Sequence, residues 1–137
     1  MSICLGEVHH TKVDMIKALV VDDDVVYQNL LCRLLGSRGI QVVGRASGMD
    51  QAALLYRATD PDVVLVGLSS VNRDSLSVLA KIREVDASAK VIVLSIFNSF
   101  DEVEKGEGEL ADAYLLKGSS AKDIVSTIRD VVIDNEE

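Results

Sequence analysis

Short apolar runs alternate along the chain with stretches in which apolar residues recur every three to four positions. The first pattern is typical of β-strands and the second of amphipathic helices. Strand patterns occur in five places: Ile16 to Val21, Gln41 to Ala46, Val63 to Leu68, Val91 to Ser95 and Ala113 to Leu116. A helical pattern follows each of them, and this strict alternation predicts a parallel sheet with right-handed crossovers.

Three of the five runs, near residues 20, 65 and 93, are apolar at consecutive positions, as in strands that are buried on both faces. The run from Gln41 to Ala46 is mixed, which indicates an edge strand. We therefore expect a doubly wound α/β sheet with the first, third and fourth strands inside. This domain should cover residues 15–134, after a flexible N-terminal extension of residues 1–14 and before a tail or linker that begins at residue 135.

Capping signals mark where several helices should begin. Ser47 with Asp50, and Ser120 with Asp123, have the spacing of capping boxes. The second helix should end before the only proline of the chain, Pro61. The fourth helix, over residues 99–110, should be short or partly unwound, because it contains two glycines and few apolar anchors.

Length and composition narrow the functional classes. The chain has 137 residues, 48% of them hydrophobic, which is enough for one domain with a core of its own. No apolar run approaches the roughly 18 residues that a membrane span needs, so a cytoplasmic protein is expected. The formal net charge of −8 would repel a phosphate backbone, which argues against direct binding of nucleic acid.

Polar side chains with related chemistry lie at the ends of three of the predicted strands. Asp22 and Asp23 follow the first strand, Ser95 ends the fourth, and Lys117 follows the fifth. In doubly wound sheets the functional crevice lies beyond the carboxyl ends of the strands, where these residues should meet. Carboxylates are ligands for Mg²⁺, and a hydroxyl and an ammonium group can bind phosphoryl oxygens.

Four segments, in this order, resemble bacterial response-regulator receiver domains: Leu19 to Asp24, Pro61 to Val66, Val91 to Ser95 and Ala113 to Lys117. The resemblance covers residues 15–134 and is greatest to receivers that are attached to LuxR/NarL-type DNA-binding domains. It implies a flavodoxin-like (βα)5 fold with the strand order 2-1-3-4-5. It also implies roles for five residues: Asp22 and Asp23 as metal-site acids, Ser95 as the switch hydroxyl, Tyr114 as the switch aromatic and Lys117 as the phosphoryl-binding lysine.

The sequence departs from this family where the phosphoryl group would be attached. Gly67 stands at the position of the phosphoacceptor aspartate, and glycine has no side chain that can form an acyl phosphate. Ile96 replaces a small residue and should crowd the pocket. Without a third carboxylate, a Mg²⁺ site at Asp22 and Asp23 should be weak or absent, and no other cofactor is expected.

We interpret the chain as a pseudo-receiver, a non-enzymatic module in bacterial signal transduction and transcription regulation that acts by phosphorylation-independent protein–protein interaction. Its partner would be a separate protein, an attached output domain that follows Glu137, or a second copy bound through the surface of residues 99–134. Lys117 should pair permanently with Asp22 or Asp23. Two alternatives remain open: a conventional phosphorelay receiver that uses Asp62 or Asp74, and a flavodoxin-like module that binds a small ligand.

Overall fold

The computed structural model describes residues 16–68, 73–96 and 111–134. Its strands are β1 (Lys17–Val21), β2 (Gln41–Ala46), β3 (Val63–Leu68), β4 (Val91–Ser95) and β5 (Ala113–Leu116). Its helices are α2 (Val25–Ser37), α3 (Met49–Thr59), α4 (Arg73–Val85) and α6 (Ala121–Asp134).

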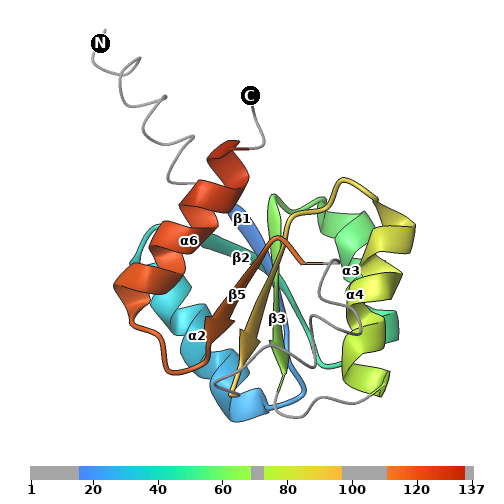
Figure 1. Ribbon diagram of the computed structural model, residues 1–137, viewed down its shortest axis with the longest axis horizontal. Coiled ribbons are helices and arrows are strands. Elements are labelled where there is room, and N and C mark those ends of the chain that lie inside the picture. Colours follow the sequence, from blue (N-terminus) through green and yellow to red (C-terminus); the bar gives the residue numbers. More distant parts are fainter. Residues whose placement is uncertain (1–15, 69–72, 97–110, 135–137) are drawn as a thin grey trace, which may run out of the picture.

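The five strands form one sheet in the order β2-β1-β3-β4-β5, and every neighbouring pair is parallel. Helices α2 and α6 cover one face of this sheet, and α3 and α4 cover the other (Figure 1). The predicted flavodoxin-like fold and its strand order are confirmed. All five carboxyl ends of the parallel strands lie along the same edge, which we call the carboxyl edge of the sheet.

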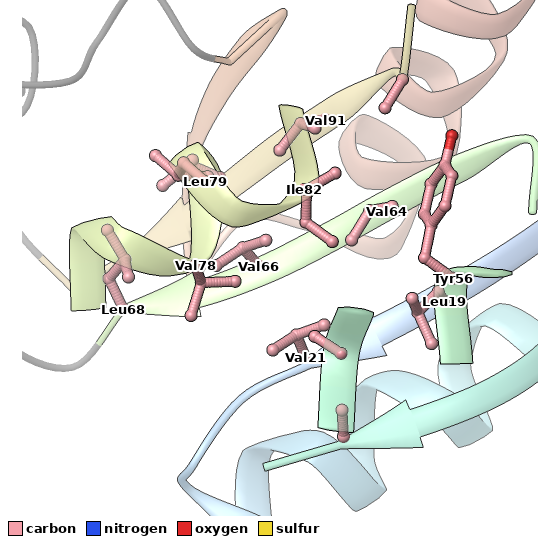
Figure 2. Close-up of a cluster of buried hydrophobic side chains, with 14 residues drawn as sticks. Leu19, Val21, Tyr56, Val64, Val66, Leu68, Val78, Leu79, Ile82 and Val91 are labelled. Atoms are coloured by element: carbon pink, nitrogen blue, oxygen red, sulfur yellow. The ribbon is translucent and has the colours of Figure 1, made fainter. Parts of the chain in front are cut away.

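The two faces of the sheet support separate apolar clusters, because successive strand residues point in opposite directions. Leu19 of β1 belongs to the cluster beneath α3 and α4, whereas its neighbour Val20 belongs to the cluster beneath α2 and α6. Figure 2 shows the first cluster, in which strand side chains pack against side chains of α3 and α4. The strands contribute Leu19, Val21, Val64 and Val66, and the helices contribute Tyr56, Val78, Leu79 and Ile82. Each fully buried leucine or isoleucine contributes roughly 1.5–3 kcal/mol, so these clusters stabilise the edge on which the site is built.

Side-chain caps fix the beginnings of α2 and α6. Asp24 precedes α2, and its carboxylate accepts hydrogen bonds from the backbone N–H groups of Val26 (3.1 Å) and Tyr27 (3.2 Å). Ser120 precedes α6, and its hydroxyl accepts a hydrogen bond from the N–H of Asp123 at 3.1 Å. The predicted start of the last helix is confirmed.

The predicted start of the second helix is wrong in detail. Gly48, rather than Ser47, precedes α3, and no side chain caps this helix. The Oε1 atom of Gln51 instead accepts a hydrogen bond from the N–H of Ser47 at 3.0 Å. The predicted end is confirmed: the chain turns at Asp60, which has a left-handed φ of 48°, immediately before Pro61.

Three predictions fall on residues outside the described parts of the chain. They are the N-terminal extension over residues 1–14, the weak fourth helix over residues 99–110 and the tail from residue 135. Within the described parts there are four helices, and none of these is long and apolar enough to cross a membrane.

Replacing the cap of α2 should weaken the fold measurably. We expect Asp24→Ala to lower the free energy of unfolding by about 1 kcal/mol, because two backbone donors at the helix start lose their acceptor. Asp23→Ala is the matched control, since Asp23 is an exposed neighbouring acid. Urea denaturation without Mg²⁺ measures both; equal stability of the two variants would contradict the capping role.

Candidate functional site

The structure brings four of the predicted residues together at the carboxyl edge. Asp22 follows β1, Gly67 lies in β3, Ser95 ends β4 and Lys117 follows β5. The strand register places them side by side, since Leu68 pairs with Ser95 and Ser95 pairs with Leu116. The site is therefore built by the ends of four parallel strands, as expected for a doubly wound fold.

An ion pair between Asp22 and Lys117 lies at the centre of this site. The Nζ atom of Lys117 is 2.9 Å from Oδ2 of Asp22, and the two side chains are only 8% and 1% exposed. Oδ1 of Asp22 accepts a hydrogen bond from the N–H of Asp24 at 2.9 Å. Among the described residues Oδ2 has no hydrogen-bond donor of good geometry, so the nearby ammonium charge compensates for its burial.

Tyr27, in the first turn of α2, holds Lys117 in two ways. Its ring centroid is 4.6 Å from the ammonium nitrogen, and its hydroxyl donates a hydrogen bond to the Lys117 carbonyl at 3.0 Å. Burial, and then the charge of Asp22, raise the pKa of Tyr27 to about 12. The hydroxyl therefore stays protonated at neutral pH and remains a donor.

Gln28 binds backbone groups next to the ion pair. Its buried amide donates hydrogen bonds to the carbonyls of Asp22 and Ala46, both at 3.0 Å. Its Oε1 atom accepts a hydrogen bond from Nε of Arg45 at 3.2 Å. Gln28 thus ties the ends of β1 and β2 together, which fixes the position of Asp22.

The sequence analysis missed both Tyr27 and Gln28. A usable signal exists for Gln28, because it lies three and seven positions before Leu31 and Leu35, on the buried face of α2. A polar side chain on such a face needs hydrogen-bond partners. No equivalent signal identifies Tyr27, since an aromatic residue early in a helix is common in ordinary cores.

Gly67 lies directly against the carboxylate of Asp22. A Cβ atom at position 67 would be 1.9 Å from Oδ2 and 2.5 Å from Cγ of Asp22, closer than real Cβ atoms come to any neighbour. The carboxylate of Asp22 therefore occupies the space into which a side chain at position 67 would extend. This arrangement of Asp22 requires glycine at position 67.

The other predicted site residues surround this centre. Ser95 is fully buried, and its carbonyl accepts a hydrogen bond from the N–H of Lys117 at 2.7 Å. Tyr114 of β5 is partly buried and packs against the cluster beneath α3 and α4. Ile96 is 57% exposed, and the space beside Gly67 is filled by Asp22, so crowding of the site by Ile96 stays a prediction.

The acids of this site do not fit a magnesium ion as they stand. Both oxygens of Asp22 are engaged, and the carboxylate of the exposed Asp24 caps α2, which leaves Asp23 as the exposed acid without a capping role. Across residues 16–68, 73–96 and 111–134, no group of three histidine, cysteine or acidic residues could hold a metal ion. Affinity for Mg²⁺ depends on the number and charge of such ligands, so the weak site at Asp22 and Asp23 remains a prediction.

Comparison with known proteins identifies the family. A family model described as the response regulator receiver domain matches residues 18–129. The chain belongs to this family. As a receiver domain of two-component signalling it is not an enzyme, and the site at its carboxyl edge lies where the receiver fold builds its functional crevice.

Relatives of this receiver domain include complete response regulators. The nitrate/nitrite response regulator protein NarL of Escherichia coli strain K12 is 31% identical over 111 residues, which are 80% of this chain and 51% of the relative. The response regulator UvrY of E. coli O6:H1 is 35% identical over 118 residues, or 85% of this chain and 54% of the relative. The chain thus spans about half the length of these two relatives.

A solved structure supports the same assignment. The crystal structure of a two-component response regulator of the LuxR family, from Aurantimonas sp. SI85-9A1, superposes with a TM-score of 0.78 and 25% sequence identity. The similarity covers 88% of this chain and 86% of the solved chain. Both the sequences and the structure therefore place this receiver domain among NarL- and LuxR-like response regulators.

The buried ion pair makes a testable contribution to stability. We expect Lys117→Met to lower the free energy of unfolding by about 1–3 kcal/mol, because Asp22 would remain buried without its compensating charge. Lys81→Met is the control, since Lys81 forms only an exposed pair with Glu84. Urea denaturation compares the two variants.

A double variant separates loss of charge balance from loss of packing. Combining Lys117→Met with Asp22→Asn removes both charges, so the combined cost should be smaller than the sum of the two single costs. Simple addition of the two single costs would show that the charges do not interact.

Proposed function

We propose that this receiver domain is a pseudo-receiver, which transmits its signal without an aspartyl phosphate. One observation carries the proposal: the carboxylate of Asp22 occupies the space that a side chain at position 67 would need. Gly67 cannot itself accept a phosphoryl group, since it offers no nucleophilic atom. The local packing is therefore adapted to glycine and leaves no room for an acceptor carboxylate.

On this proposal, Asp22 is the permanent anionic partner of Lys117. The ammonium group is already neutralised by the buried carboxylate and is faced by the ring of Tyr27. A phosphoryl group would have to displace an intramolecular partner that is always present. The domain would therefore keep one arrangement of β5 and α6, whatever the activity of a phosphate donor.

A domain fixed in this way would act through binding. The relatives are named response regulators, and they are about twice as long as the region that this chain matches. We therefore propose that the domain controls an attached output domain, as in transcription regulation, or a separate protein partner. Association of two copies through the surface of residues 99–134 is part of the same proposal.

The alternative acceptors have little support. Asp62 precedes β3, and its Oδ2 atom accepts a hydrogen bond from the N–H of Lys17, the first residue of β1, at 2.8 Å. It thus lies at the amino edge of the sheet, opposite Lys117. Asp74 is the second residue of α4, beyond the strand end. A ligand-binding module that uses the carboxyl edge is also less favoured, because neither cavity found among the described residues is lined by Asp22, Gly67 or Lys117.

The first test is covalent modification. We expect no phosphoryl adduct when the protein is incubated with acetyl phosphate and Mg²⁺ and its intact mass is measured, because position 67 carries no carboxylate. A receiver domain with an intact acceptor aspartate, treated in parallel, shows that the reagent is active. A hydroxylamine-sensitive adduct on any aspartate, Asp22 included, would sink the proposal.

The second test probes the space beside Gly67. Gly67→Ala should lower the free energy of unfolding by about 1–3 kcal/mol, because the new Cβ must push Asp22 away from Lys117. Gly36→Ala is the control, since a Cβ there meets no atom within 4 Å and alanine favours the helix.

Moving the carboxylate from one strand to the other gives a sharper result. The double variant Asp22→Ala with Gly67→Asp returns a partner to Lys117 and should be more stable than Gly67→Asp alone, in which two carboxylates compete for the same space. Urea denaturation measures this difference. A double variant that is no more stable than Gly67→Asp would show that the two positions do not share one space.

A further inference from the structure

A second polar site lies between α2 and α6 and shares no residue with the ion-pair site. A cavity of about 290 Å³ opens between the carboxyl end of α2 and one face of α6. Its lining contains three cations, one hydroxyl, one acid and one apolar residue: Arg38, Lys122, Arg129, Ser126, Asp130 and Val125. We call this the α2–α6 pocket.

The two helices supply this lining in a simple way. The five α6 residues recur at intervals of three and four positions, so they lie on one face of the helix. Arg38 directly follows the last residue of α2. Helices α2 and α6 lie on the same side of the sheet (Figure 1), which brings Arg38 opposite the α6 face.

The charge of the pocket is opposite to that of the chain. Three cations and one acid give a local charge of 3 − 1 = +2, although the whole chain has a formal net charge of −8. Arg38 and Lys122 are exposed, and among the described residues neither donates a side-chain hydrogen bond or an ion pair. Lys122 also lies in the first turn of α6, where a cation opposes the helix dipole. Helix stability therefore does not account for it.

The size and donors of the pocket define the ligand class. Its volume is at the lower limit of small-molecule sites, which span roughly 300–1,000 Å³. Guanidinium groups bind phosphoryl oxygens through paired hydrogen bonds, and the Ser126 hydroxyl adds a further donor. Val125 is 6% exposed and offers an apolar floor. A charge of +2 matches a phosphate dianion better than a single carboxylate.

We propose that the α2–α6 pocket binds a small phosphorylated molecule through its phosphate dianion. The ligand would bridge Arg38 to Lys122 and Arg129, and so join the end of α2 to α6. Helix α2 carries Tyr27, which contacts Lys117, and α6 begins four residues after Lys117, so both helices are linked to the ion pair along the chain or by contact. The site is independent of whether position 67 can be phosphorylated.

The test is a titration of the folded protein with inorganic phosphate, in which backbone amide NMR shifts are measured at each phosphate concentration. Sodium chloride keeps the ionic strength constant. Saturable shifts are expected at Arg38 and along the pocket face of α6, from Lys122 to Asp130. Shifts that are linear in phosphate concentration, or that spread over the whole surface, would overturn the proposal.

Paired variants identify the residues responsible. Arg38→Gln with Lys122→Gln should weaken phosphate binding at least about tenfold, because two charge-assisted donors are lost. The control is Arg57→Gln with Lys81→Gln, which makes the same change in net charge on the α3 and α4 side and should leave the affinity unchanged. If both double variants lost the same affinity for phosphate, binding would depend only on net charge, and the proposal would be wrong. Circular dichroism of both double variants establishes that they are folded.

Discussion

The buried ion pair between Asp22 and Lys117 is the interaction on which this site depends. It joins residues that follow β1 and β5, three strand spacings apart in the sheet, or about 14 Å. The two side chains must therefore meet above the intervening strands, where β3 presents Gly67. Burial of two charges is costly, and here the Asp24 N–H and the Tyr27 ring offset part of that cost. Glycine at position 67 and the placement of the Tyr27 ring both fit this one contact.

The same residues also explain how a receiver scaffold can remain intact while its chemistry changes. The fold depends on strands that are apolar on both faces, and none of those positions takes part in the site. On the function proposed here, the carboxylate that faces Lys117 is carried by β1 instead of β3. The charge of Lys117 is thereby neutralised by a side chain of the same domain. On the same proposal, covalent modification can no longer change the charge balance at the carboxyl edge.

Most of the fold could be predicted from the sequence because its strands are unusually apolar. Four predicted strands have the same ends in the structure, and β1 begins one residue later than predicted. The start of α3 could not be predicted, because Ser47 and Gly48 both suit a helix start and the choice depends on the side chain of Gln51. Four of the predicted site residues, Asp22, Gly67, Ser95 and Lys117, lie together at the carboxyl edge, as the topology predicts.

Sequence could not assign separate roles to three consecutive aspartates, which are chemically identical. In the structure Asp22 is buried against Lys117, Asp23 is exposed and Asp24 caps α2. Their roles depend on which way each residue points as the chain leaves β1. The contact between Asp22 and Gly67 was likewise invisible, since it joins residues 45 positions apart through the absence of a side chain.

The placement of Tyr27 has a consequence for spectroscopy. The chain has no tryptophan and only three tyrosines, so its near-ultraviolet signal comes from very few groups. One of these faces the ammonium of Lys117 and donates its hydroxyl proton to the backbone of the same residue. Any movement of α2 relative to Lys117 alters the charge and the hydrogen bond felt by this chromophore together. The protein therefore carries its own optical reporter of the ion pair, without an added label.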